Sequence, residues 1–277
     1  MFLQTAKKLI REALGRLSAI ARVDVRAAYN KEYGILQFET AELSGEHFLV
    51  HKILRDLFEE VVVFDVGANE GDYANLILGE FERRKIFCFE PHPKTFARLK
   101  SRLSQKEGVV CVQSALGAVA GQMTLYDYAS GEGSSHASLY SSVLTMQHGA
   151  DSVSAYDVPV DTIDVLRSRL GVPSLTLLKI DAEGHELECL KGAINSIEAG
   201  RIALVHFEFN EMNVVSRSFL FDFYQILPGF SFYRLRQDGL LRLGAYNARH
   251  EVFQYQNILA ASPEVAPLLE KYVVKAI

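Results

Sequence analysis

The chain lacks an excess of positive charge. Its 277 residues carry 29 Lys and Arg against 34 Asp and Glu, which gives a formal net charge of −5. Surfaces that bind nucleic acids are typically basic, so this balance argues against a nucleic-acid partner. The sequence also lacks any run of about 18 apolar residues, the length that a membrane-spanning helix needs. Functions that depend on a nucleic-acid surface or on a transmembrane helix are therefore not expected.

Cysteine is scarce as well. The three cysteines, Cys88, Cys111 and Cys189, all lie in apolar segments that are expected to be strands or helices. An odd number in such contexts favours reduced, packed thiols over a disulfide framework. The N-terminus lacks the compact apolar run and the cleavage site of a secretory signal. We therefore expect a cytoplasmic protein, and 277 residues with 49% apolar content suit one α/β domain with appendages.

The most informative segment that is present joins a strand, a glycine turn and a helix. The apolar run 61–66 is typical of a buried parallel strand. Gly67 and Gly71 follow, and glycines in such a turn let the backbone bend tightly and approach a ligand. The N–H groups at the start of the next helix, from Tyr73, can hold an anionic part of that ligand. This arrangement forms the cofactor-binding half of a doubly wound α/β domain.

A carboxylate ends the second predicted strand. The apolar stretch 85–90 finishes in Glu90, and Pro91 and Pro93 stop the strand there. A carboxylate at this tip is placed to accept two hydrogen bonds from a ribose diol. Together, the glycine turn and the tip carboxylate predict a cofactor that contains adenosine.

The residues of the turn favour one adenosine cofactor over another. Binding of a nicotinamide dinucleotide usually requires Gly-x-Gly-x-x-Gly, but Asn69 replaces the second glycine here. Glu70 and Asp72 also place negative charge where a pyrophosphate would approach. S-adenosylmethionine has no phosphate and carries an ammonium and a sulfonium, so an acid-rich turn suits it. In this interpretation Asp65 lies near the ammonium and Glu90 binds the ribose.

A second polar signature follows another buried strand. The run 175–181 is apolar except for Lys179 and Asp181, and Glu183, His185 and Glu186 come directly after it. These side chains are expected at the carboxyl end of the strand, where ligands of open α/β sheets bind.

Five strings in the chain resemble the FkbM family of S-adenosylmethionine-dependent methyltransferases. They are VFDVGANEGDY, CFEPHP, QSALG, VDTID and LLKIDAEGHELECLKGA, and the similarity runs from about residue 64 to 260. The resemblance implies a class I methyltransferase of Rossmann-like fold, with a doubly wound, seven-stranded, mostly parallel sheet. It also implies O-methylation of a hydroxyl on a sugar, a glycan or a secondary metabolite. The acceptor would then be a small molecule or a glycan.

The motifs nominate one set of residues that bind the methyl donor and a second set that act in catalysis. The adenine ring of the donor is expected to lie after the third strand. The residues expected to bind S-adenosylmethionine are Asp65, Gly67, Ala68, Asn69, Gly71, Tyr73, Glu90, Pro91, Ser114, Ala115, Leu116 and Asp181.

Four side chains are candidates for the base that removes the acceptor proton. His185 titrates near neutral pH, but it can instead bond to the backbone at the start of a helix. Glu183 is a base or a helix cap, and Asp181 orients the acceptor or the methyl donor. Glu208 points either into the site or to the surface. The same acids could gather around a magnesium ion, but nothing in their spacing requires one.

The periodicity divides the chain into a lead-in, 1–45, and a methyltransferase domain, 46–277. Residues 2–21 form a basic amphipathic helix whose apolar face suits a sheet cap, a homodimer contact or a peripheral membrane contact. The Ser- and Gly-rich segment 129–156 is predicted to be a substrate loop or lid, or else a disordered insertion. The family resemblance places Ser135, Ser138 and Leu139 close to the active site.

The remaining pattern predicts alternating helices and strands. We expect strand 121–128 beside the third strand, and the last two strands as an antiparallel hairpin. The expected helices cover 47–58, 72–83, 94–104, 186–197 and 219–227, and the expected strands cover 61–66, 85–90, 108–113, 121–128, 175–181, 201–209, 230–236 and 252–260. Residues 158–170 are expected to form a short strand that leads into a helix.

Two other functions stay open at this point. One is a NAD-dependent oxidoreductase of Rossmann-like fold, which Asn69 and the acidic turn disfavour. The other is a non-catalytic S-adenosylmethionine-binding module, which the run of acids from Asp181 to Glu186 disfavours.

Overall fold

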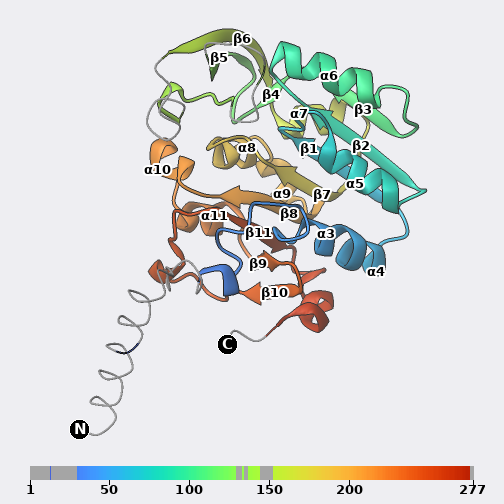
Figure 1. The fold of residues 1–277 in the computed structure, drawn as a ribbon. Coiled ribbons are helices and arrows are strands. Elements are labelled where there is room, and N and C mark those ends of the chain that lie inside the picture. The colour runs from blue at the N-terminus through green and yellow to red at the C-terminus, as the bar shows by residue number, and fades with distance from the viewer. Residues whose placement is uncertain (1–12, 14–29, 129–132, 134–136, 144–151, 275–277) are drawn as a thin grey trace, which may run out of the picture.

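The structure is a computed structural model that describes residues 13, 30–128, 133, 137–143 and 152–274. An eight-stranded sheet forms its centre, in the order β10-β9-β11-β8-β7-β1-β2-β3 (Figure 1). Its strands are β1 (Val61–Val66), β2 (Arg84–Phe89), β3 (Val109–Val112), β7 (Leu175–Ile180), β8 (Ile202–Phe209), β9 (Ser231–Arg236), β10 (Gly239–Arg242) and β11 (Gln256–Ala261).

The half of the sheet from β3 to β8 is parallel, and β11 is antiparallel to both β8 and β9. This mostly parallel α/β sheet was predicted, but the count of seven strands is wrong for the described residues. The eighth strand, β10, lies inside the predicted connection 237–251. Arg236 pairs with Gly239, so only Gln237 and Asp238 form the turn between β9 and β10. A two-residue turn of this kind is typical of a hairpin.

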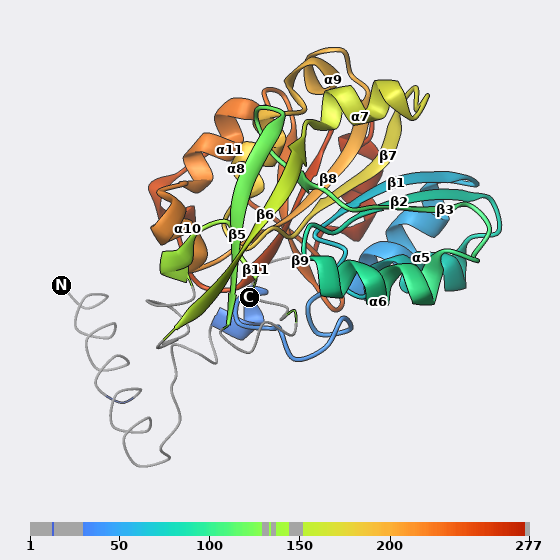
Figure 2. The ribbon, with the colours of Figure 1, turned by 90° about the horizontal axis from the view of Figure 1, so that it is seen from above.

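Helices cover both faces of the sheet, as a doubly wound fold requires (Figure 2). The apolar side chains of each layer form their own core against the sheet. One layer holds α3 (Glu46–Phe48), the π-helical η1 (Leu49–Leu54), α4 (Arg55–Leu57), α5 (Asp72–Glu80), α6 (Pro93–Leu103) and the 3-10 helix η4 (Ala266–Tyr272). The other holds α7 (Ile163–Arg169), α8 (Glu186–Lys191), α9 (Ile194–Glu198) and α11 (Leu220–Ile226).

A second sheet of three strands stands beside the first, near α7 and α8 (Figure 1). It contains β4 (Ala115–Leu116), β5 (Gly121–Tyr128) and β6 (Val153–Asp161), in the order β4-β6-β5. The prediction that strand 121–128 pairs with the third strand is therefore wrong. Leu125 packs instead with Ala115, Val158 and Val160, which form a small core belonging to this sheet.

Several boundaries differ from the prediction for local reasons. The expected helix 186–197 is two helices, α8 and α9, separated at Gly192. A Cβ at Gly192 would lie 2.1 Å from the carbonyl oxygen of Gly117, so the chain packs too closely there for another residue. Strand β6 already begins at Val153, inside the predicted loop 129–156. Three short helices were not predicted, namely α10 (Met212–Ser216), η3 (Ala248–His250) and η4.

The predicted N-terminal helix 2–21 lies outside the described residues, apart from Ala13. Its proposed contacts with a partner or a membrane surface stay predictions. Among the helices that the structure describes, none has both the length and the apolar character needed to cross a membrane.

Candidate functional site

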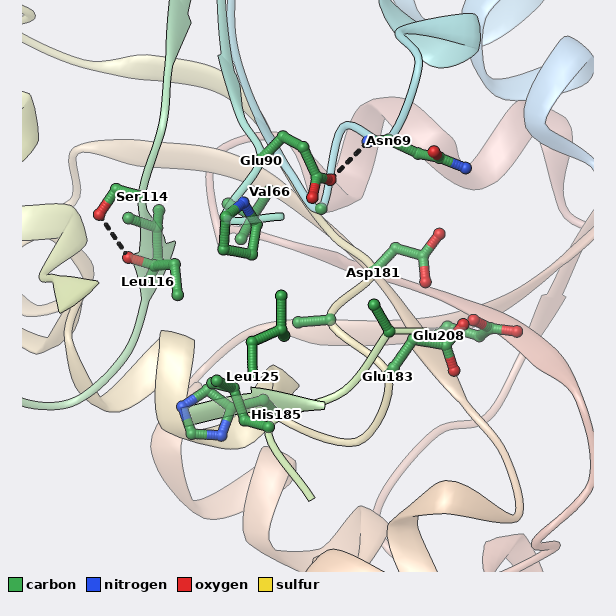
Figure 3. Close-up of a pocket in the computed structure, with 16 residues that line it drawn as sticks. Val66, Asn69, Glu90, Ser114, Leu116, Leu125, Asp181, Glu183, His185 and Glu208 are labelled. Carbon is green, nitrogen blue, oxygen red and sulfur yellow. Dashed lines mark hydrogen bonds between the residues drawn. The ribbon is translucent and has the colours of Figure 1, made fainter. Parts of the chain in front are cut away.

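A cavity of about 170 Å³ opens at the carboxyl ends of β1, β2, β7 and β8 (Figure 3). This is the position where the chain crosses between the two halves of the parallel sheet, and ligands of open α/β sheets bind at such a point. The lining residues are Val66, Gly67, Asn69, Glu90, Pro91, Ser114, Ala115, Leu116, Leu125, Ala137, Leu139, Asp181, Ala182, Glu183, His185 and Glu208. The fold thus brings together most of the residues nominated from sequence, including all four candidate bases.

The glycine turn forms the floor between the strands. Gly67 has a φ of +71°, and a Cβ on it would lie 1.8 Å from the carbonyl oxygen of Asp181. The N–H groups of Gly67 and Ala68 both donate to the carbonyl oxygen of Phe89, at 3.0 Å. The turn is therefore held against the ends of β2 and β7, and only glycine fits at position 67. Gly71 lines no described cavity; it packs its backbone against Leu103 of α6.

Glu90 is held in one orientation at the tip of β2. Its Oε2 accepts the N–H of Asn69 at 3.0 Å, and its Oε1 accepts the N–H of His92 at 2.8 Å. Asn69 adopts a left-handed conformation, with a φ of 47°. Burial raises the pKa of the Glu90 carboxyl to about 7, although the two N–H groups lower it. The carboxylate retains lone pairs that can accept hydrogen bonds from a ligand.

A second cavity of about 540 Å³ adjoins the first and shares Gly67, Asn69 and Asp181 with it. The remaining lining residues are Ala41, Glu46, His47, Ala68, Asp72, Tyr73, Asn75, Leu76 and Lys179. Ala68 and Tyr73, both nominated from sequence, face this cavity rather than the first. Residues 41–47 belong to the lead-in and α3, where sequence motifs gave no guidance.

Lys179 is a buried cation that sequence reasoning did not assign to the site. Its Nζ lies 3.3 Å from Oδ1 of Asp65 and 3.3 Å from Oδ2 of Asp181. Burial disfavours the charged amine, but Asp181, Asp65 and Glu46 outweigh burial and raise the pKa of Lys179. Asp65 is fully buried beneath this lysine and lines neither cavity. The sequence did contain a signal for this role, because a charged residue such as Lys179 inside an apolar strand requires a partner of opposite charge.

Asp181 and Glu208 form a carboxyl pair at the ends of β7 and β8. The two carboxyl groups lie close enough for each to shift the pKa of the other. Burial raises the pKa of both carboxyls, but Lys179 reverses this for Asp181, whose pKa falls below its usual range. Burial and the neighbouring Asp181 raise the pKa of Glu208 well above its usual range. When the pair carries one proton, Glu208 is therefore favoured to hold it, and Asp181 is favoured to be ionised.

Among the described residues, the site holds more carboxyl groups than basic groups. Glu46, Asp65, Asp181 and Glu208 surround the single cation Lys179. Burial raises the pKa of Glu46 to about 7. A cationic ligand would stabilise the ionised forms of these carboxyls.

The acids of the glycine turn contribute less than the sequence suggested. Nε of Arg98 donates to Glu70 at 2.7 Å, and an amine of Arg102 donates to Asp72 at 2.7 Å. Glu70 lines neither of the two cavities. The acidic character of the first cavity thus comes from carboxyls at or just after strand ends, whereas Glu46 of α3 and Asp72 line the second cavity.

His185 is buried, and its ring is held from one side. Its Nδ1 lies 3.1 Å from the hydroxyl of Tyr140, and its Nε2 is buried beside Gly117. Burial lowers the pKa of His185 to about 4, so the ring is neutral near pH 7. Because Nε2 is buried and Nδ1 contacts the Tyr140 hydroxyl, this geometry suits a positioning role better than proton removal.

Residues 137–143 lie against the turn that contains Glu183. The hydroxyl of Ser138 donates to the carbonyl oxygen of Glu183 at 2.9 Å, and Leu139 lines the cavity. Glu183 has a φ of 52°, a conformation that is costly for a residue other than glycine. The family resemblance placed Ser138 and Leu139 near the site, and the structure does so too. Ser135 lies outside the described residues.

The wall opposite the acids is mainly apolar. Figure 3 shows Ser114 and Leu116 on the side of the cavity away from Asp181 and Glu208. The hydroxyl of Ser114 donates to the carbonyl oxygens of Ala115 at 2.8 Å and Pro159 at 3.2 Å. Its hydrogen is thus already engaged, and the wall offers carbon and backbone atoms to a flat ligand.

Among the described residues, no three His, Cys, Asp or Glu side chains are grouped in a way that could hold a metal ion.

The sequence profile described as Methyltransferase FkbM domain matches residues 65–232. The chain belongs to the FkbM methyltransferase family. This confirms the resemblance and does not favour the NAD-dependent oxidoreductase. The matched range contains every nominated site residue, whereas Glu46 lies before it.

Two curated relatives of this FkbM protein are named for methyl transfer. The hexuronic acid methyltransferase AglP of Haloferax volcanii is 28% identical over 165 residues, which cover 59% of this chain and 63% of AglP. The 2-O-methyltransferase NoeI of Sinorhizobium fredii is 22% identical over 174 residues, which cover 59% of this chain and 70% of NoeI. Among solved structures, the precorrin-6y C5,15-methyltransferase of Geobacter metallireducens covers 82% of this chain and 91% of its own, with 9% identity and a TM-score of 0.43.

Proposed function

We propose that this FkbM family member transfers a methyl group from S-adenosylmethionine to a hydroxyl oxygen of a sugar, a glycan or a secondary metabolite. The observation that carries the proposal is the pair of joined cavities whose buried carboxyls outnumber the one lysine. S-adenosylmethionine is a cationic adenosine compound without phosphate, and this charge suits it. One relative is named for a sugar acid as acceptor and the other for methylation of an oxygen, and together these names support the acceptor class.

The residues present fit this methyl donor. Glu90 would accept the ribose hydroxyls, because two backbone N–H groups already fix its carboxylate at the cavity. Ser114 to Leu116 would contact the adenine. Gly67, Asn69 and Asp181 line both cavities, so a ligand that extends along the glycine turn would contact the two. Glu46 and Tyr73 would face the ammonium group in the second cavity, and Asp65 would act on it only through Lys179.

S-adenosylmethionine supplies, when bound, a methyl group on a sulfonium that leaves readily. The protein must hold the acceptor hydroxyl in line with that methyl group, and such orientation contributes roughly 7–11 kcal/mol in well-aligned systems. The hydroxyl must also lose its proton. Asp181 is the ionised carboxyl that faces the cavity, with 41% of its side chain exposed. We assign Asp181 as the acceptor of this proton, with Glu208 donating a hydrogen bond to it.

Glu90→Gln is expected to weaken S-adenosylmethionine binding by about 10- to 100-fold. The amide has one acceptor oxygen where the carboxylate has two, and a hydrogen bond to a charged group contributes roughly 1.5–3 kcal/mol. Calorimetric titration of the two proteins measures the change. Glu107→Gln, at an exposed position far from the cavities, is the matched control. Unchanged affinity in the Glu90 variant would contradict its assignment to the ribose.

Binding of the donor is expected to release protons and to become tighter between pH 6 and pH 8. The pKa values of Glu46 and Glu90 are both raised to about 7, so each carboxyl is partly protonated at neutral pH. A bound cation favours the ionised form, and lowering the pH removes that attraction. Calorimetry in two buffers with different ionisation enthalpies counts the protons released. Glu46→Gln should lower the count, and net proton uptake by the unmodified protein would contradict the charge assignment.

A further inference from the structure

The acceptor side of the first cavity combines acids with apolar side chains. Beyond the residues assigned to the donor, Leu125, Ala137 and Leu139 line it together with Glu183 and Glu208. Among the described residues, neither lysine nor arginine lines this cavity. Carboxyl oxygens bind hydroxyl groups, and apolar side chains pack against the carbon faces of a ring.

The cations nearest to the site are already engaged. Lys179 lines the second cavity rather than the first, and its Nζ pairs with Asp65 and Asp181. Arg98 donates to Glu70 at 2.7 Å and to the carbonyl oxygen of Gly133 at 2.8 Å. Moving either side chain toward an acceptor would break contacts with these partners.

The sequence of the neighbouring segment reinforces this pattern. The chain contains no lysine or arginine between Lys106 and Arg167, a stretch that includes β5, β6 and residues 137–143. The same stretch contains the acids Asp127, Glu132 and Asp157. The described residues that this segment contributes to the cavity are all uncharged: Ser114, Ala115, Leu116, Leu125, Ala137 and Leu139.

Resting on the proposed function, we infer that the methylated hydroxyl belongs to a sugar or polyol residue that carries neither carboxylate nor phosphate. Proteins recognise those groups with arginine, lysine or converging N–H donors, and the acceptor side offers no such side chain among the described residues. An anion placed beside Asp181 and Glu183 would also be repelled, since like charges across an interface are strongly disfavoured. The site would thus select against acidic acceptors such as sugar phosphates and uronic acids, and in this it would differ from AglP, which is named for hexuronic acid.

The test combines the full-length protein with a trideuteromethyl-labelled donor and a cell extract. The extract comes from cells of the source organism in which the gene for this protein has been deleted, so that its acceptor is still unmethylated. Products are fragmented, and mass spectrometry identifies the residue that carries the label. A labelled residue without carboxylate or phosphate is expected. A labelled uronic acid or sugar phosphate would overturn the inference while leaving methyl transfer intact. Absence of label from every fraction would instead contradict the proposed function.

The identified acceptor then allows a matched comparison. Oxidation of its primary alcohol to a carboxylate should lower kcat/KM by at least about tenfold, because the new charge meets the acids of the site. Glu183→Gln removes one of these acids. Whatever its effect on the overall rate, it should bring the kcat/KM values for the neutral and the oxidised acceptor closer together. Equal kcat/KM values for the neutral and the oxidised acceptor would overturn the inference.

Discussion

The Asp181→Asn variant is expected to lose methyl transfer by roughly 10²- to 10⁴-fold, the usual contribution of a positioned base. Asparagine keeps the shape of the side chain but cannot take up the acceptor proton. Lys179 retains Asp65 and Glu46 as partners, so the fold and donor binding should change far less than the rate.

Transfer of tritiated methyl from the donor to a cell extract measures the rate, and calorimetry measures donor affinity. Asp157→Asn serves as the matched control, because Asp157 is exposed on β6 and lines neither cavity. A full rate in the Asp181 variant would show that another group takes the proton, and Glu183 would then be the next residue to test. Loss of donor binding to the same extent as the rate would assign Asp181 to the donor instead.

Gly67→Ala is expected to abolish measurable donor binding and to destabilise the fold by about 2–5 kcal/mol. The new Cβ would lie 1.8 Å from the carbonyl oxygen of Asp181, so the turn or the end of β7 must move. The φ of +71° adds backbone strain of roughly 1–3 kcal/mol for a residue with a side chain. The displacement would shift Asn69, whose N–H orients Glu90.

Gly79→Ala is the matched control for this variant. Gly79 lies inside α5, and a Cβ there meets nothing within 4 Å. Alanine should therefore stabilise the helix by roughly 0.5–1 kcal/mol. Thermal unfolding of both variants measures stability, and calorimetry measures donor binding. Normal affinity in the Gly67 variant would show that the turn does not form the floor of the donor site.

The local parts of this site could be predicted from sequence. The strand, the glycine turn and Glu90 follow one another within a short stretch, and their geometry is set by neighbouring residues. The strand that ends in Asp181 is equally local. The carboxyl ends of parallel strands lie at the same edge of a sheet. The strand pattern therefore also predicted that Glu90 and Asp181 lie in one site.

The remaining parts depend on contacts between distant segments. Glu46 reaches the second cavity only because α3 packs beside the glycine turn, and no motif marks it. Tyr140 meets His185 across 45 positions of the chain. The strand at 121–128 has the same alternation whether it pairs with β3 or with β6, so its true partner could not be predicted. The charge balance around Lys179 likewise depends on which acids the fold brings to it.

The most direct test of the central claim is calorimetric titration of one preparation with S-adenosylmethionine and, separately, with NAD at neutral pH. Carboxyl groups that outnumber the single lysine should give saturable binding of the cationic methyl donor and no saturable binding of the dinucleotide, whose pyrophosphate is anionic. Saturable binding of NAD with no heat from S-adenosylmethionine would contradict the account.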